Sequence, residues 1–251
     1  TNVVATQVEE NSVLYNVYTA IFENSLYFTT VIEKVEDHQH IKGASHLEVV
    51  ENELCHVERC TVCNVILVKE ATAQTVIVTT AEDLKVALEY GKEVVLAESV
   101  DLDGSINVTK STTITINENV VITATKDTVG DGVFHVMNDA TLTINGNGKV
   151  DAYGPENYYC IAVWADGGHV ILDGNGTYTN NGAYSEEDGA HFDLIYVKNG
   201  GTVVINGGTF SSLEKGKDNS NGWAYVFINR GEGTPLMTIN NANVNGNAHG
   251  V

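Results

Sequence analysis

Basic residues are scarce in this chain of 251 residues. Thirteen Lys and Arg side chains stand against 33 Asp and Glu side chains, which gives a formal net charge of −20 at pH 7. A surface of that charge repels phosphate backbones, so we expect no nucleic acid partner. Long apolar runs are absent as well: no stretch of about 18 apolar residues occurs, and we expect no membrane span.

Cysteine is also rare, with four residues in the chain, too few for a scaffold built on disulfides. The N-terminal stretch TNVVATQVEENS lacks the basic start and the apolar centre of a signal peptide. With 43% hydrophobic residues, the chain can still bury a substantial core. These features predict a globular protein.

A short pattern recurs along the second half of the chain. TLTINGNGKV at 141–150 returns as HVILDGNGTY at 169–178 and as TVVINGGTF at 202–210. The repeat has five apolar anchor positions, which are Ile116, Ile144, Leu172, Ile205 and Ile239. Their steps of 28, 28, 33 and 34 residues are typical of stacked supersecondary units. Asn or Asp follows each anchor and tolerates the left-handed backbone of a corner, at Asn117, Asn145, Asp173, Asn206 and Asn240.

Three strands are predicted in each repeat. Alternating apolar residues, such as Leu142 and Ile144, indicate a strand at the anchor, and stretches such as FHVM at 134–137 indicate a strand before it. A third strand follows the anchor and is marked by Ile122, Val150, Tyr178, Phe210 and Val244. Three strands per repeat with Asn or Gly at the corners predict an all-β fold, a parallel β-helix or solenoid. The corner amides then bond to one another or to neighbouring backbone.

A short helix is predicted near 80–91. Thr80 and Asp83 form a start like a capping box, Leu84 and Leu88 share one face, and Gly91 ends the helix. Such a helix protects the open end of a solenoid, so we expect the β-helix and its capping helix to occupy 71–251. Residues 1–70 carry no copy of the repeat and predict a separate β-rich attachment region.

The first strand of each repeat is apolar on both faces, which is typical of a sheet covered on both sides. We expect an inward row of Val136, Val163, Val197 and Ile228. Their neighbours then form one outer row of Met137, Trp164, Tyr196 and Phe227, with Trp223 in a loop leading to it. The row is covered by the chain's own loops, contacts another subunit or binds sugar rings; we favour subunit contact.

A cluster of possible metal ligands lies at 37–66, in DHQHIKGASHLEVVENELCHVERCTVCNVI. Cys60-x-x-Cys63 can hold two sides of a tetrahedral zinc ion. We expect the ligands to come from Cys55, Cys60, Cys63, His38 and His40, with His46 and His56 as further candidates. The segment resembles small zinc-ribbon-like modules found between domains of bacterial surface proteins. A disulfide, or reduced thiols beside solvated histidines, is the alternative.

From TTAEDLKVALEYGKEVVL at 79–96 through the TINGNG repeats, residues 79–251 resemble the pectate-lyase-like superfamily of right-handed parallel β-helices. They are most similar to its non-catalytic members, the fibre and decoration proteins of phages and the adhesive domains of bacterial surface proteins. The resemblance implies a right-handed solenoid that associates side by side, with a trimer favoured. It says little about activity, because function depends on a site and not on a fold.

The catalytic residues of that superfamily have no clear counterpart in this sequence. Its lyases use an Arg or Lys base beside acidic calcium ligands. Arg occurs here only at Arg59 and Arg230, and INRGEGTP does not match the Arg-x-x-Pro pattern of that superfamily. The best carboxylate candidates lie in SEEDGAHFD and are Glu186, Glu187, Asp188, His191 and Asp193. We therefore expect a protein without enzyme activity, with a polysaccharide lyase or glycoside hydrolase as an alternative.

The expected function is structural. We predict a bacteriophage virion component, such as a fibre, spike or capsid decoration, that displays a β-helix for attachment to host surfaces or glycans. Its partners would be further copies of itself and other virion or surface proteins, bound through the N-terminal region. A secreted cell-surface adhesin, located outside the cell or on the bacterial surface, is the other structural alternative.

Overall fold

The computed structural model describes residues 2–10, 13–22, 28–34, 40–125, 132–152, 161–180, 194–212, 226–229 and 231–245. This part of the chain is mostly β, with one helix and several parallel sheets. The chain divides into two compact units. The N-terminal unit holds residues 1–46 and 56–70, and the C-terminal unit holds residues 47–55 and 71–251. Within the described ranges no helix combines the length and apolar character needed to cross a membrane.

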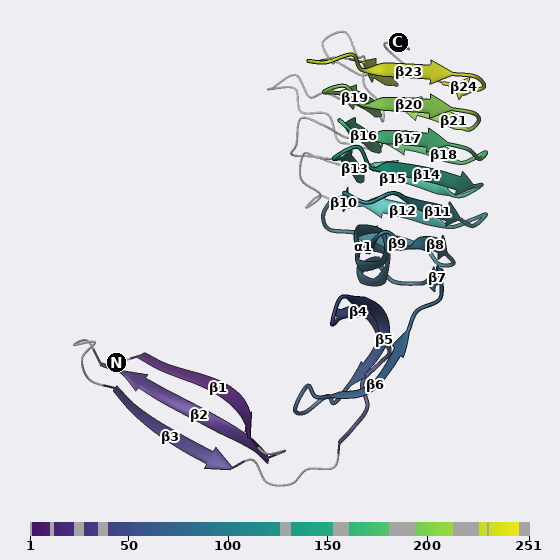
Figure 1. The fold of residues 1–251 in the computed structure, drawn as a ribbon. Helices are drawn as coiled ribbons and strands as arrows, with labels where there is room; N and C mark the ends of the chain where they lie inside the picture. Colours follow the sequence, from purple (N-terminus) through teal and green to yellow (C-terminus); the bar gives the residue numbers. More distant parts are fainter. Residues whose placement is uncertain are drawn as a thin grey trace. The chain divides into compact units, whose positions relative to one another are not determined.

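An antiparallel sheet of three strands begins the N-terminal unit, in the order β1 (Asn2–Glu10), β2 (Val13–Ile21) and β3 (Phe28–Lys34) (Figure 1). Successive residues alternate between its two faces, so Tyr18 lies beside Val31 while Val17 lies beside Ile32. Val31 and Ile32 are 60% and 65% exposed, and none of the described side chains of this sheet is buried. The sheet therefore carries apolar side chains in solvent on both faces.

A second small antiparallel sheet follows, in the order β4 (His46–Val50), β5 (Glu53–Arg59) and β6 (Ile66–Ala71). Glu51 and Asn52 make the turn between β4 and β5 with positive φ angles of 54° and 66°. Leu47 and Leu54, both in the C-terminal unit, are buried in the core of that unit.

The predicted helix is confirmed as α1 (Ala81–Tyr90). The side chain of Thr80 accepts a hydrogen bond from the backbone N–H of Asp83, and Gly91 ends the helix in the left-handed conformation with φ 91°. Leu84, Ala87 and Leu88 face the core of the C-terminal unit and are fully buried. Figure 1 shows α1 at the β8–β10 end of the parallel sheets.

Three parallel sheets follow in the C-terminal unit, and from β8 onward each takes every third strand (Figure 1). The first sheet contains β10 (Ile106–Val108), β13 (Phe134–Met137), β16 (Val163–Asp166), β19 (Ile195–Lys198) and β22 (Phe227–Asn229). The second sheet contains β7 (Thr75–Val78), β8 (Glu93–Leu96), β11 (Thr112–Ile116), β14 (Thr141–Gly146), β17 (His169–Leu172), β20 (Thr202–Ile205) and β23 (Leu236–Ile239). The third sheet contains β9 (Val100–Leu102), β12 (Val121–Ala124), β15 (Lys149–Ala152), β18 (Thr177–Asn180), β21 (Thr209–Ser212) and β24 (Asn243–Val244).

The register of the third sheet confirms the predicted third-strand row. Ile122, Val150, Tyr178, Phe210 and Val244 pair in sequence from one repeat to the next. The rings of Tyr178 and Phe210 stack with their centroids 5.0 Å apart and their planes 5° apart. Aromatic stacking in such a row adds to the gain from burying apolar area.

The anchor row of the second sheet is confirmed for Ile144, Leu172, Ile205 and Ile239, which pair in sequence. The prediction for Ile116 is wrong, because Ile114 pairs with Ile144 while Ile116 lies opposite Gly146. The corner after β11 is the cause. Eight residues separate Ile114 from Ile122, but six separate Ile144 from Val150, so this corner contains two additional residues. Gly146 is suited to its place, since it has φ 95° and a Cβ there would lie 2.1 Å from the carbonyl oxygen of Ile116.

The corner side chains form the expected ladder over three repeats. Asn206 Nδ2 donates to Asp173 Oδ1 at 3.1 Å, and Asn240 Nδ2 donates to Asn206 Oδ1 at 2.8 Å. The amide and carboxylate groups therefore hydrogen-bond to one another along the stack. This is a structural use of the repeated Asn and Asp.

Candidate functional site

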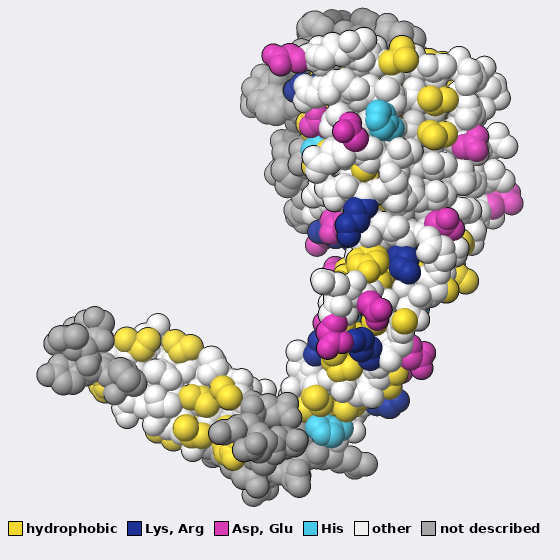
Figure 2. All heavy atoms as spheres, in the orientation of Figure 1, with side chains coloured by type: hydrophobic (Ala, Val, Ile, Leu, Met, Phe, Trp, Pro, Cys, Tyr) yellow, Lys and Arg dark blue, Asp and Glu magenta, His cyan; other side chains and the backbone are white. Residues whose placement is uncertain are grey.

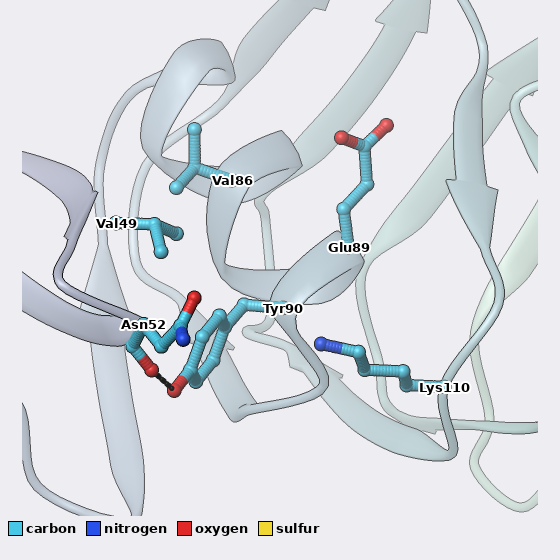
Figure 3. A pocket seen from close by; sticks show the side chains of 6 residues that line it. All are labelled: Val49, Asn52, Val86, Glu89, Tyr90 and Lys110. Carbon is cyan, nitrogen blue, oxygen red and sulfur yellow. Dashed lines mark hydrogen bonds between the residues drawn. The ribbon is translucent and has the colours of Figure 1, made fainter.

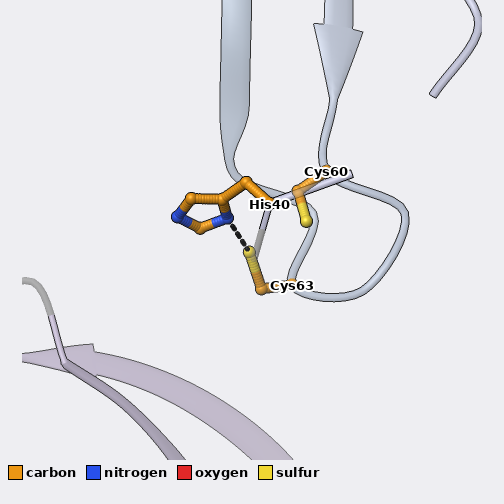
Figure 4. Close-up of side chains that lie close together, drawn as sticks. All are labelled: His40, Cys60 and Cys63. Carbon is orange, nitrogen blue, oxygen red and sulfur yellow. Dashed lines mark hydrogen bonds between the residues drawn. The ribbon is translucent and has the colours of Figure 1, made fainter. Parts of the chain in front are cut away.

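Three possible metal ligands converge in the N-terminal unit: His40, Cys60 and Cys63 (Figure 4). One donor atom of each lies within 4.8 Å of the donor atoms of the other two. His40 Nδ1 and Cys63 Sγ are 3.4 Å apart and form a hydrogen bond. Cys60 is buried, Cys63 is half-buried and His40 is exposed, so the cluster lies at the surface.

The backbone holds these three residues in place. Cys60 directly follows β5 and begins a turn. In this turn the N–H of Asn64 donates to the carbonyl of Cys60 at 2.9 Å, and Asn64 has a left-handed φ of 61°. The segment that carries His40 runs antiparallel to the chain at Cys60. Lys42 and Cys60 form an antiparallel β-bridge, and the N–H of Thr61 donates to the carbonyl of Ile41 at 2.9 Å. His40 is thereby placed beside the Cys-x-x-Cys turn, 20 residues away in the chain.

Hydrogen bonds favour the thiolate of Cys60. Burial opposes ionisation of this thiol, but hydrogen bonds from the backbone N–H groups of Cys63 and Val62 and from the His40 side chain outweigh it and lower the pKa of Cys60 to about 5. The N–H of Val62 lies 3.4 Å from Cys60 Sγ. A thiolate is the form of cysteine that binds metals and acts as a nucleophile.

The predicted ligand set is only partly brought together. His38 lies outside the described residues, and the described cluster contains neither His46 nor His56. Cys55 is a free, fully buried thiol that does not belong to the cluster. It lies on β5 five residues before Cys60, and an extended strand of that length spans about 16 Å, too far for both sulfurs to bind one ion.

The outer row predicted on the first sheet is wrong in its register. Phe134, Val163, Ile195 and Phe227 pair in one row, and His135, Trp164, Tyr196 and Ile228 pair in the next. Phe227 is therefore in an inward row, 4% exposed, and its ring contacts that of Phe210 at 5.2 Å. Met137 is two positions further along and pairs with Asp166. Trp223 lies outside the described residues.

The outward row of the first sheet is instead centred on stacked rings. His135 and Trp164 stack with centroids 4.4 Å apart, and Trp164 meets Tyr196 edge to face at 5.6 Å. His135 Nε2 also contacts Asp166 Oδ2 at 3.2 Å. His135 and Tyr196 are 8% and 6% exposed within the single chain, so they leave little surface for a partner. Trp164 is half-buried, and its buried Nε1–H has no acceptor among the described residues.

Asp151 is a buried carboxylate that the sequence analysis did not consider. It accepts hydrogen bonds from Lys149 Nζ at 2.7 Å and from Thr179 Oγ1 at 2.9 Å. Both carboxylate oxygens thus have a partner from the outward face of the third sheet. This arrangement stabilises the pairing of β15 with β18.

A hollow beside α1 is lined by Val49, Asn52, Val86, Glu89, Tyr90 and Lys110 (Figure 3). Tyr90 donates its hydroxyl hydrogen to the carbonyl of Asn52 at 2.7 Å, and Lys110 Nζ lies 4.8 Å from the Tyr90 ring centroid. The Tyr90 hydroxyl and the Lys110 ammonium therefore each have a partner within the hollow. Sequence analysis missed it because Asn52 and Lys110 are far apart in the chain.

The carboxylate candidates Glu186, Glu187, Asp188, His191 and Asp193 lie outside the described residues. Comparisons of the chain with family models, curated proteins and solved structures find no match.

Proposed function

We propose that this chain is a structural attachment protein, in which residues 71–251 form a right-handed parallel β-helix of the pectate-lyase-like type and residues 1–70 bind partners in an assembly. The repeat, the every-third-strand order of three parallel sheets and the helix at one end support this fold. A bacteriophage virion component is the function that we favour. A secreted or cell-surface adhesin is the alternative location for the same scaffold.

The apolar sheet of the N-terminal unit carries the proposal. Exposed apolar residues lie on both faces of β1, β2 and β3, including Val3 and Val31 on one face and Val4 and Ile32 on the other. Figure 2 shows part of this surface over the N-terminal strands. A three-stranded sheet needs apolar burial to be stable, and large exposed apolar patches mark sites of protein contact. The sheet thus supports association, with further copies of the chain as the first candidate partner and a trimer as the favoured closed symmetry.

The chemistry of the described repeats supports a scaffold in place of an enzyme. Polar side chains on the outward faces of the parallel sheets contact each other, as His135 contacts Asp166 and Lys149 contacts Asp151. The Asn and Asp of the corners likewise bond along the stack. Such groups stabilise the repeat and leave attachment to the surfaces at its edges.

Two measurements test the proposal. Light scattering coupled to size exclusion should show a concentration-dependent oligomer, and immunogold electron microscopy of source cultures should place the label on virus particles. Label on the cell envelope would move the scaffold to the adhesin alternative. Depolymerisation of acidic polysaccharides by the purified protein would overturn the structural function.

A further inference from the structure

The N-terminal unit has almost no hydrophobic core. Among its described residues, only Val57 and Cys60 are buried. Small folded regions with so little apolar burial usually depend on disulfides, a structural metal or association. Neither Cys60 nor Cys63 is in a disulfide. A structural metal or association therefore has to supply what disulfides would supply.

We propose that His40, Cys60 and Cys63 bind one Zn²⁺ ion that stabilises the N-terminal unit. Around a tetrahedral zinc ion, a thiolate sulfur and an imidazole nitrogen lie about 3.6 Å apart, given the usual Zn–S and Zn–N bond lengths. His40 Nδ1 and Cys63 Sγ are 3.4 Å apart, and Cys60 Sγ lies within 4.8 Å of both. Small side-chain rotations are enough to bring all three atoms into contact with one ion.

The donor types select zinc among the common divalent metals. Two thiolates and one imidazole are ligands of Zn²⁺, whereas Mg²⁺ and Ca²⁺ require oxygen ligands. The Val62 N–H that points at Cys60 Sγ stabilises negative charge on the sulfur. Three protein ligands leave one tetrahedral position for a water molecule.

The ion would join two segments that lie about 20 residues apart in the chain. One is the stretch from His40 to Gly43, and the other is the turn from Cys60 to Val65. Backbone bonds already align them, through Thr61 to Ile41 and through Gly43 to Arg59. A metal bridge between them replaces apolar burial, because the free energy of metal binding becomes free energy of folding.

The first test measures zinc in the full chain, purified with reductant and without chelator. Native mass spectrometry and elemental analysis should find one zinc ion per chain. Each of the variants Cys60→Ser, Cys63→Ser and His40→Ala should lose most of that zinc, while the control variants Cys55→Ala and His56→Ala should retain it. Substituting Co²⁺ should produce the thiolate-to-cobalt charge-transfer absorption in the wild type, and this absorption should be much weaker in the Cys60→Ser and Cys63→Ser variants.

A second measurement does not depend on the folding of any variant. Amide hydrogen exchange of the wild-type chain, with and without a zinc chelator, should show faster exchange at residues 40–43 and 60–65 after zinc removal. Exchange in the parallel sheets of the C-terminal unit should stay unchanged. The proposal is overturned by a zinc-free chain that does not take up added zinc, by a Cys60–Cys63 disulfide in the reduced preparation, or by equal zinc loss from the Cys55→Ala control.

Discussion

In the C-terminal unit, inward residues of the repeat such as Ile144, Leu172 and Ile205 are at most 2% exposed, whereas the N-terminal unit buries only Val57 and Cys60 among its described residues. Each repeat of the C-terminal unit buries apolar side chains against the next repeat, so the stability of this unit grows with the number of repeats. The N-terminal strands have many hydrogen bonds to one another but little apolar burial. Pairing of strands is therefore not sufficient, and we expect the N-terminal unit to gain stability from the proposed metal or from a partner.

The largest effect is expected in the packed rows of the C-terminal unit. Leu172 is fully buried between Ile144 and Ile205. Leu172→Ala should lower the free energy of unfolding by about 2–5 kcal/mol, because it removes apolar contacts and leaves a cavity. Chemical denaturation followed by circular dichroism measures this change. Ile171→Ala, on the outward side of the same strand, is the control and should have a clearly smaller effect; equal effects would contradict the packed row.

The next effect concerns association through the N-terminal sheet. Ile32 is 65% exposed. Ile32→Lys places a charge on this apolar face of the sheet and should weaken self-association at least about tenfold, or about 1.4 kcal/mol. Light scattering over a concentration series measures it. Ile77→Lys changes a residue of the C-terminal unit that is 67% exposed and should leave the oligomer intact. An unchanged oligomer in the Ile32 variant would rule out this face of the sheet as the contact.

A smaller loss of folding stability is expected from the hydrogen-bonded corner side chains Asp173, Asn206 and Asn240. Asn206 bonds to both Asp173 and Asn240, and Asn206→Ala removes both bonds. Each bond contributes about 0.5–1.5 kcal/mol, and the exposed position favours the lower end of that range. Thermal unfolding should show the loss, and Asn117→Ala, outside this ladder, should be closer to wild type. A larger loss from Asn117→Ala would mean that the ladder contributes nothing specific.

The smallest effect appears only in alkali. Burial raises the pKa of Tyr178 above its usual value, so the folded state binds its proton more tightly than the unfolded state does. This contribution to stability is fully present below about pH 10 and is lost as the pH rises toward the raised pKa. Tyr178→Phe keeps the stacked ring and should lose less stability than the wild type between neutral and strongly alkaline pH. Identical alkaline denaturation curves would show that Tyr178 does not titrate on unfolding.

Much of the architecture could be predicted from local patterns. The Thr80 cap, the Gly91 stop and the buried face of α1 follow from spacings within a few residues, and all three are confirmed. The third-strand row was predicted without an error from Ile122 to Val244. Period-two alternation and regular corners supply that information, because the same environment recurs in every repeat.

The errors arise where the corners differ in length. Two additional residues after β11 displaced Ile116 from the anchor row, and variable corners before the second sheet placed Phe227 in the wrong row. A shift of one residue moves a strand side chain to the opposite face, so alternation alone does not decide which neighbours share a row. The stacking of His135 on Trp164 was missed for the same reason.

The sequence by itself determined the strands, the helix, the apolar rows and the Cys-x-x-Cys turn, since these depend on residues that are neighbours in the chain. The tertiary structure alone decided which repeat positions pair, that Phe227 faces inward and that His40, among several possible ligands, meets Cys60 and Cys63. Those choices depend on corner lengths and on backbone hydrogen bonds between distant segments, such as the bond from Thr61 to Ile41. Contacts of this kind depend on where distant segments lie in the folded chain, and no short stretch of sequence specifies that.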